Sequence, residues 1–376
     1  MRGPDRRGLL RLDDVGEGYP NEPSDEDVAS AAGIGLERVL RFDLNTLGGG
    51  PLPAVAAALA DYPADRAVEY GDPGYGRLRA ALARVTGGHP ERIIPGAGAD
   101  ELIRLVTTSV VGPGDRVLIP TPTFGMFEVE ARLAGASVVS VPRDDPGTRQ
   151  PAGRLRAAAE EARARLVWLC SPNNPTGDAY SADEIRVVAQ GLAGVVVVDA
   201  VYQEFAEATL GVASESTGLL PLQEELPNLL ILRSLAKAYG LAGARVGYLQ
   251  VPASLAARFD LARLPLSIGG PSEALAIAAL SDVVAARTRH ALLVNERARL
   301  AGALEAAGWR VLPSLTNFVL ARPPDGLAHV VAERLAAEGL VVRGYPAGQL
   351  VEWLRITARA PEHNRLLLAA LGLAGR

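Results

Sequence analysis

Residues 233–248 read Arg-Ser-Leu-Ala-Lys-Ala-Tyr-Gly-Leu-Ala-Gly-Ala-Arg-Val-Gly-Tyr, and Lys237 within this stretch is the only lysine in the chain. A GC-rich genome favours arginine codons over lysine codons, which explains why lysine is otherwise absent. The one lysine that remains is therefore informative. Arginine cannot lose its proton and attack a carbonyl, whereas a desolvated lysine can. The small neighbours Ala236 and Ala238 are typical of a Schiff-base lysine. The alternative is a chance surface lysine.

The composition is that of an ordinary globular protein. The chain has 376 residues, of which 48% are hydrophobic and 22% charged, and this length favours two lobes over one small domain. The net charge of -5 makes neither nucleic acid nor an anionic membrane an expected partner. The single cysteine, Cys170, excludes an intramolecular disulfide and fits a reducing, cytoplasmic setting. We find no signal peptide and no apolar run long enough to span a membrane.

The sequence predicts no metal site. One cysteine cannot build a cysteine-based zinc site, and the four histidines have no ligand spacing. We interpret all four as surface or loop residues: His89, His290, His329 and His363.

Apolar, β-branched runs alternate with amphipathic helical segments through the middle of the chain. The runs occupy residues 92–95, 116–120, 137–141, 165–170, 194–199 and 228–233, and helical patterns such as 100–111 and 181–190 lie between most of them. This alternation predicts an α/β fold with a largely parallel sheet covered by helices on both faces. Polar residues follow the strand ends, at the edge where open α/β sheets bind ligands: Asn173, Asn174, Asp199 and Ser234.

The flanking segments predict an arm and a second lobe. Residues 1–50 form an acidic N-terminal arm with one short helix capped by Ser24, and residues 51–265 form the large domain. The pattern changes near residues 265–271, so residues 266–376 are expected to form a smaller α+β domain. Within it we expect one or two long helices over 272–307, strands at 318–322 and 353–357, a helix over 327–338 and a last helix from Pro361.

Two turns that follow predicted strands suggest places for an anion and for a flat ring. Residues 95–101, Pro-Gly-Ala-Gly-Ala-Asp-Glu, put free backbone amides around Ala99 and Asp100 at a helix start, which suits an anion. The alternative is a tight turn capped by Asp100. Phe124, in Pro-Thr-Phe-Gly-Met-Phe at 122–127, stacks on a flat ring or belongs to the core.

Together these residues meet the demands of one cofactor, pyridoxal 5′-phosphate. It needs a lysine for its aldehyde, a carboxylate for its ring nitrogen, donors for its phenolate oxygen, an aromatic face, and an anion pocket with arginine. The residues that fill these roles in turn are Lys237, Asp199, Tyr202 with Asn174, Phe124, and the Ala99–Asp100 turn with Ser234 and Arg245. We expect Lys237, Asp199 and Tyr202 to be the catalytic residues.

The chain resembles fold-type I pyridoxal-phosphate enzymes of the aspartate aminotransferase superfamily, and is most similar to histidinol-phosphate aminotransferases. The resemblance covers about residues 38–373. The motifs that carry it are Gly-Ala-Asp-Glu at 98–101, Pro-Thr-Phe-Gly-Met-Phe at 122–127, Ser-Pro-Asn-Asn-Pro-Thr-Gly at 171–177, the Lys237 segment, Thr-Asn-Phe-Val-Leu-Ala-Arg at 316–322 and Leu-Arg-Ile-Thr at 354–357. It implies a mostly parallel seven-stranded sheet and a homodimer with shared active sites.

The resemblance also implies substrate residues. Arg355 would grip the anionic group of the substrate or of glutamate, assisted by Arg322. Tyr70 would reach the cofactor phosphate of a neighbouring subunit. Asn45 opens the N-terminal motif near the substrate entrance, and the arm with Tyr19 would fold over that entrance.

The chain departs from the family pattern at three places. Ala236 replaces a hydroxyl residue that contacts the phosphate, and Ala200 replaces a glutamate. Leu47 and Gly48 replace an asparagine and a proline near the entrance.

Three functional hypotheses follow. The first is an aminotransferase with glutamate and 2-oxoglutarate as partner substrates. The second keeps the cofactor but has a decarboxylase, lyase or cyclising reaction, like the related threonine-phosphate decarboxylases. The third is a cofactor-binding regulator, although the short acidic arm offers no basic DNA-binding domain.

Overall fold

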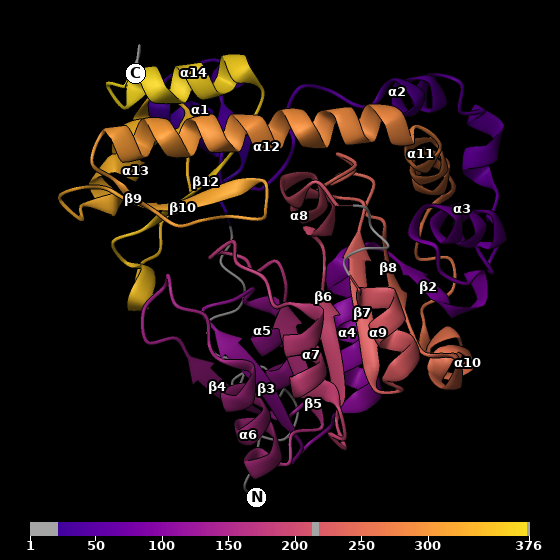
Figure 1. The fold of residues 1–376 in the computed structure, drawn as a ribbon. Helices are drawn as coiled ribbons and strands as arrows, with labels where there is room; N and C mark the ends of the chain where they lie inside the picture. Colours follow the sequence, from indigo (N-terminus) through magenta and orange to yellow (C-terminus); the bar gives the residue numbers. More distant parts are fainter. Residues whose placement is uncertain (1–21, 213–217, 374–376) are drawn as a thin grey trace, which may run out of the picture.

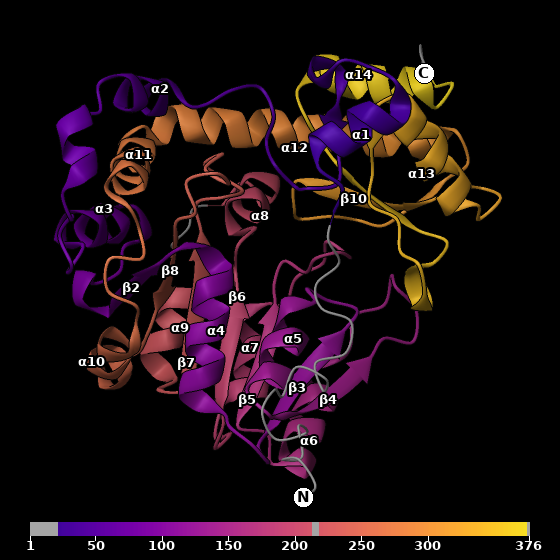
Figure 2. The ribbon, with the colours of Figure 1, turned by 180° about the vertical axis from the view of Figure 1, so that it is seen from behind.

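The computed structural model describes residues 22–212 and 218–373 as a large α/β lobe and a smaller lobe (Figures 1 and 2). The large lobe is built on a seven-stranded sheet with the strand order β2-β8-β7-β6-β5-β3-β4. Only β8 runs antiparallel to its neighbours, as expected for a mostly parallel sheet. The strands are β2 (Ile93–Gly96), β3 (Arg116–Thr121), β4 (Ser137–Pro142), β5 (Leu166–Cys170), β6 (Val195–Asp199), β7 (Leu229–Ser234) and β8 (Gly247–Gln250).

Helices cover both faces of this sheet because alternate residues of each strand point to opposite sides. In β5, Trp168 joins a core beneath α4 and α5, whereas Val167 and Leu169 join the core beneath α6 and α7. The helices of the large lobe are α2 (Pro53–Ala60), α3 (Gly76–Thr86), α4 (Gly98–Val110), α5 (Met126–Leu133), α6 (Ala152–Ala162), α7 (Ala182–Ala189), α8 (Gln203–Leu210), α9 (Leu219–Glu225), α10 (Ala253–Ala262) and α11 (Gly270–Ser281).

The smaller lobe packs helices on two short sheets. One sheet is antiparallel with the order β12-β10-β9, and the other pairs β1 with β11 in parallel. Its elements are β1 (Leu40–Arg41), β9 (Arg310–Val311), β10 (Phe318–Arg322), β11 (Leu340–Val341), β12 (Leu354–Thr357), α1 (Asp25–Ala32), α13 (Ala328–Ala337) and α14 (Pro361–Ala370). Ser24 caps α1 in a capping box with Asp27, which confirms the expected helix start.

The long helix α12 (Val283–Ala306) runs from α11 across to the smaller lobe, as both views show. One residue of this helix differs from the expectation that all four histidines are surface or loop residues. This residue is His290. His290 is 5% exposed, and its Nε2 lies 2.8 Å from the backbone oxygen of Ala238. The helix faces the core of the large lobe at this point, so the imidazole is buried there.

The expected domain boundaries stay predictions, but three contacts bear on them. Residues 22–42 of the expected arm pack on the smaller lobe through α1 against α13 and β1 against β11. Helix α11 follows the expected boundary at residue 265, yet it packs on α2 and α3 of the large lobe.

Within the described residues, no helix is both long and apolar enough to cross a membrane.

Candidate active site

A cavity of about 520 Å³ opens at the carboxyl ends of β5, β6 and β7. Cys170 and Asp199 are neighbours in the register of β5 and β6, so the ends of these strands meet at one edge of the sheet. Most of the residues expected from the sequence line this cavity: Asn45, Ala99, Asp100, Phe124, Asn174, Asp199, Tyr202, Ser234, Lys237, Arg245 and Arg355.

Lys237 lies in the turn that follows β7, with its amine in the cavity. Its Nζ donates a hydrogen bond of 2.8 Å to the backbone oxygen of Leu44. Burial, together with the nearby guanidinium of Arg355, lowers the pKa of Lys237 to about 8. A pKa near neutrality supplies the unprotonated amine that attack on an aldehyde requires.

Asp199 ends β6 and is 4% exposed. Its carboxylate accepts a hydrogen bond of 3.2 Å from the backbone N–H of Val201, and the thiol of Cys170 lies 3.9 Å away. Burial raises the pKa of Asp199 to about 7. A buried carboxylate with so few donors is costly unless a cation faces it, and this position therefore suits a protonated ring nitrogen.

Tyr202 and Asn174 place polar groups in the same cavity. Asn45 Nδ2 donates a hydrogen bond of 2.8 Å to the Tyr202 hydroxyl, and Asn45 has a left-handed φ of 55°. Burial raises the pKa of Tyr202 well above its ordinary value, so the phenol stays protonated. Asn174 Oδ1 accepts a hydrogen bond of 2.6 Å from Arg355 Nη1, which directs its NH₂ group away from that arginine.

The start of α4 and the side chains beside it form the anion pocket. Ala97, at the N-cap position, offers no side-chain acceptor to the free N–H groups of the first turn. A Cβ at Gly98 would lie 2.7 Å from Arg245 Nη2, so this arginine lies against the helix start. Arg245 also pairs with Asp100 at 2.8 Å, and Ser234 lines the same cavity.

Arg343 pairs directly with Arg355 through the backbone, whereas Arg322, expected to assist Arg355, lies two residues beyond Leu320, the residue of β10 that faces Arg355. The backbones of Arg343 and Arg355 exchange hydrogen bonds of 3.1 and 2.8 Å, which sets their side chains on one face. Arg343 does not itself line the cavity, but its ion-pair partner Glu22 does. Arg322 ends β10, does not line the cavity, and forms an ion pair of 2.9 Å with Glu352.

Two expected residues lie elsewhere. Tyr70 is 88% exposed, in a surface hollow that also contains Glu273. Tyr19 lies outside the described residues. The cavity also includes residues that sequence analysis missed: Glu22, Asp43, Leu44, Met126, Cys170, Val201 and Ala242. Leu44 contributes a backbone oxygen, for which a sequence carries no signal. Asp43 also contributes one, which Arg355 contacts.

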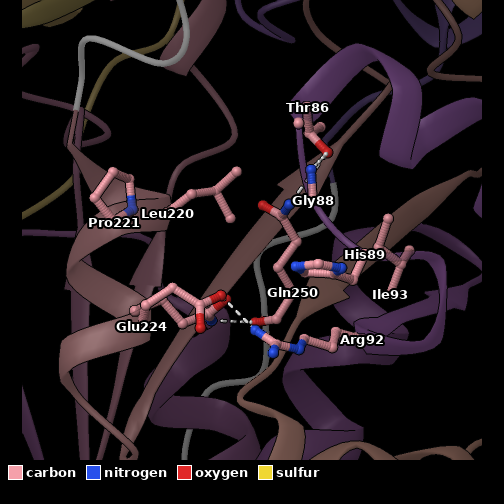
Figure 3. Close-up of a pocket in the computed structure, with 11 residues that line it drawn as sticks. Thr86, Gly88, His89, Arg92, Ile93, Leu220, Pro221, Glu224 and Gln250 are labelled. Atoms are coloured by element: carbon pink, nitrogen blue, oxygen red, sulfur yellow. Dashed lines mark hydrogen bonds and ion pairs between the residues drawn. The ribbon is translucent and has the colours of Figure 1, made fainter.

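A second cavity, of about 390 Å³, lies between α9 and the residues that follow α3 (Figure 3). Gln250 forms part of its wall and donates to Thr86 Oγ1 at 3.2 Å, and an Arg92–Glu224 ion pair lies beside it. None of the residues expected to be functional lines this cavity.

The first cavity fits pyridoxal phosphate in three independent ways. It holds an amine of lowered pKa, a buried carboxylate short of donors, and an uncapped helix start next to an arginine. Ala236, 6% exposed, leaves the anion pocket without the hydroxyl that the family usually places there. The fold and the site together define an enzyme that uses this cofactor.

Comparison with known proteins identifies the family. Residues 37–371 match the family "Aminotransferase class I and II". A histidinol-phosphate aminotransferase of Roseiflexus castenholzii is 36% identical over 97% of this chain and 97% of its own. The chain therefore belongs to aminotransferase class I and II, a family of pyridoxal-phosphate-dependent enzymes.

Solved structures show the same fold. The crystal structure of histidinol-phosphate aminotransferase from Sinorhizobium meliloti in complex with pyridoxal-5′-phosphate has a TM-score of 0.84 and 30% identity, over 94% of each chain. L-threonine-O-3-phosphate decarboxylase from Porphyromonas gingivalis has a TM-score of 0.69 and 22% identity, over 89% of this chain and 98% of its own, a likeness of fold alone.

Proposed function

We propose that this enzyme transfers an amino group between histidinol phosphate, or a similar amino phosphate, and the pair glutamate and 2-oxoglutarate. The observation that carries the proposal is the placement of the Lys237 amine, the Asp199 carboxylate and the Arg355 guanidinium around one cavity. The neighbouring Arg343 supports an anionic substrate, because two guanidinium groups on one face suit a phosphate or a carboxylate. The similarity to histidinol-phosphate aminotransferases supports the choice of amino phosphate.

Each residue has a role that follows from its surroundings. When bound, pyridoxal phosphate supplies an electron-withdrawing ring that stabilises negative charge at the substrate Cα. Asp199 holds a proton on the ring nitrogen through a buried, charge-assisted contact. The Lys237 amine, whose pKa in the cofactor-free protein is about 8, would take the proton from the substrate Cα and later give it back. Tyr202 and Asn174 donate to the phenolate oxygen.

The remaining residues bind and orient. The first turn of α4, Ser234 and Arg245 hold the cofactor phosphate, and Phe124 covers one face of the ring. Arg355 binds the anionic group of the substrate, with Arg343 beside it and Asn45 at the entrance. We leave Arg322 out of the proposed site because its side chain pairs with Glu352 away from the cavity.

The proposal is tested by single half-reactions of the purified, cofactor-loaded enzyme. Histidinol phosphate and glutamate should each convert the bound cofactor to its amine form, seen as loss of the visible absorption band, without release of carbon dioxide. Carbon dioxide release with a carboxylated amino phosphate would support the decarboxylase instead. A spectrum that no amino compound changes would support a cofactor-binding regulator.

The proposal includes a homodimer in which Tyr70 of one subunit serves the active site of the other. The high exposure of Tyr70 supports this, because an exposed phenol in a Gly/Pro-rich loop is free to meet a partner. A cytoplasmic location is also part of the proposal, and the single cysteine supports it.

A further inference from the structure

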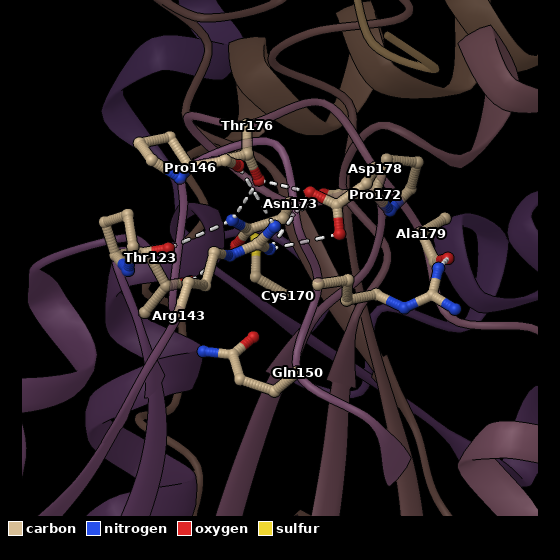
Figure 4. A network of polar contacts seen from close by, with 12 residues as sticks. Thr123, Arg143, Pro146, Gln150, Cys170, Pro172, Asn173, Thr176, Asp178 and Ala179 are labelled. Carbon is tan, nitrogen blue, oxygen red and sulfur yellow. Dashed lines mark hydrogen bonds and ion pairs between the residues drawn. The ribbon is translucent and has the colours of Figure 1, made fainter. Parts of the chain in front are cut away.

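Asn173, which precedes Asn174, is 3% exposed and lies outside the cavity lining. Figure 4 shows its side chain in a network of polar contacts with Thr123 and Thr176. Its side-chain oxygen accepts a hydrogen bond of 2.7 Å from Thr123 Oγ1. Its NH₂ group donates to the backbone oxygen of Pro122 at 3.0 Å and to Thr176 Oγ1 at 2.7 Å. Both side-chain N–H groups and the amide oxygen are thus engaged, so this amide can hardly move without breaking a bond.

These bonds join two loops that the sheet does not hold together. Strands β3 and β5 pair only through Val117 with Leu166 and Leu118 with Val167, near their amino-terminal ends. Beyond these pairs β3 continues to Thr121 and β5 to Cys170 without pairing with each other, and the loops that carry Phe124 and Asn174 follow. The Asn173 side chain connects these loops with two direct hydrogen bonds, to Thr123 and to Pro122.

A partly buried ion pair anchors the far side of the same turn. Arg143, 4% exposed, follows β4 and donates to the Asp178 carboxylate at 3.0 Å. That carboxylate also accepts the Thr176 hydroxyl, and the Asp178 backbone oxygen accepts the Asn173 N–H at 2.7 Å. The turn is thereby fixed between β3, β4 and β5, and Asn173 is its link to β3.

We propose that Asn173 is a positioning residue, which sets Asn174 and Phe124 at a fixed separation against the cofactor. The proposal rests on the proposed function, in which the Asn174 NH₂ group donates to the cofactor's phenolate oxygen and Phe124 covers the ring. Arg355 holds only the carbonyl end of Asn174, so the direction of the NH₂ group depends on the backbone that Asn173 fixes.

Loss of this link has a spectroscopic consequence. A donor to the phenolate oxygen would stabilise negative charge there, and the proton that the bound cofactor loses in the spectral change would be easier to remove. If Asn174 swung away, that proton would be held more tightly. The visible band of the bound cofactor then changes at a higher pH, by about one unit for the loss of one hydrogen bond to a charged group.

The test compares variants of the cofactor-loaded enzyme. Asn173→Asp keeps the size of the side chain but removes both donors. Thr123→Val removes only the hydroxyl that reaches Asn173. Thr123→Ser keeps this hydroxyl. The control is Asn228→Ala, since Asn228 also holds a turn through its amide, with bonds to Ala189, Leu192 and Gly194, at the opposite end of the sheet. The measurements are the pH titration of the visible band, the rate of cofactor release and the midpoint of thermal unfolding.

We expect Asn173→Asp to raise the pH of the spectral change by about one unit and to speed cofactor release about tenfold. Thr123→Val should shift both in the same direction by less, and Thr123→Ser should resemble the unaltered protein. Asn228→Ala should lower the unfolding midpoint and leave the titration unchanged.

The proposal is overturned if the Asn173 and Thr123 variants lose stability as Asn228→Ala does but titrate like the unaltered protein. If Asn173→Asp does not fold, the comparison of Thr123→Val with Thr123→Ser decides. If the unaltered protein forms no visible band with pyridoxal phosphate, the proposed function fails first, and this inference falls with it.

Discussion

Lys237 Nζ donates a hydrogen bond of 2.8 Å to the backbone oxygen of Leu44, and so joins the turn after β7 to the segment that follows β1. The amine thus rests against a neutral carbonyl, and no carboxylate among residues 22–212 and 218–373 forms an ion pair with it, although Asp100 lies near enough to act on its charge. Its charged form gains one acceptor but is costly to bury, which agrees with the lowered pKa. An amine that is held by one hydrogen bond to a neutral carbonyl can break this bond and react with an aldehyde.

We therefore predict that Lys237 carries the cofactor covalently. Borohydride reduction followed by peptide mapping should place the pyridoxyl label at Lys237, since the only other aliphatic amine is the chain terminus. Lys237→Arg should keep the fold and lose activity by orders of magnitude, because a guanidinium stays protonated. A label on the terminal amine, or none, would refute the assignment.

Asp199→Asn should have opposite effects on stability and on cofactor binding. The pKa of Asp199 rises from its ordinary value of 3.8 to about 7. Below about pH 7, the folded protein without cofactor therefore favours the protonated acid. The loss of folding free energy from burying the charged carboxylate is absent below pH 4 and grows as the pH rises towards 7. Above pH 7 this loss has its full value. It amounts to roughly 4 kcal/mol, which the neutral amide avoids.

Cofactor-free Asp199→Asn should thus unfold at a higher temperature than the unaltered protein at pH 8, and the difference should shrink towards pH 4. With cofactor the order should reverse, because removing one partner of a buried ion pair costs about 3–5 kcal/mol. Calorimetry at both pH values, with and without cofactor, measures this. A difference that does not vary with pH would contradict the role of the carboxylate.

Arg343 and Arg322 offer a matched comparison for substrate binding. Arg343→Ala should lower kcat/KM for an anionic substrate about 10- to 100-fold, as expected for a charge-assisted hydrogen bond of about 1.5–3 kcal/mol. Arg322→Ala removes an equal charge from an exposed pair with Glu352 and should change kcat/KM little. Steady-state kinetics with histidinol phosphate and with glutamate decides, and equal losses in both variants would remove Arg343 from the site.

Most of the large lobe could be predicted from its sequence, because its strands are long, apolar and separated by amphipathic helices. All six of the apolar runs form strands, and helices α4 and α7 lie where the periodicity puts them. Strand β8 was not among these runs. It is four residues long and follows a glycine-rich stretch, and short apolar runs do not reveal their structure.

The site was predictable where it depends on side chains at strand ends, and less so where it depends on packing between distant segments. Asp199 and Ser234 end strands and Asn174 follows one, and their position identifies the edge that they share. The carbonyl of Leu44 and the pairing of Arg343 with Arg355 depend on how residues 40–45 and 340–343 meet the rest of the fold. Arg343 does end an apolar run, Leu-Val-Val-Arg at 340–343, which was the available signal.

The last prediction is a homodimer whose active sites take Tyr70 from the partner. Tyr70 is 88% exposed and far from filling any core, and Val68 beside it is 81% exposed. Two apolar side chains so exposed within three residues are more readily explained by a contact with a second copy than by the isolated chain. A phenol supplied in this way would donate one hydrogen bond to the cofactor phosphate, worth about 1.5–3 kcal/mol because the acceptor is charged. Tyr70→Phe should therefore speed cofactor release without lowering the unfolding temperature of the cofactor-free protein.

Mixing two defective subunits tests whether the phenol comes from the partner. Lys237→Ala subunits keep Tyr70, and Tyr70→Ala subunits keep Lys237. A mixed dimer has one site with both defects and one site with neither, so after exchange about a quarter of all sites should be intact. The activity of the mixture should rise to about a quarter of that of the unaltered protein, which is above the activity of either variant alone. Light scattering should report a dimer at the working concentration. If Tyr70 served its own subunit, every site in the mixture would keep one defect and activity would stay low even though the subunits exchange.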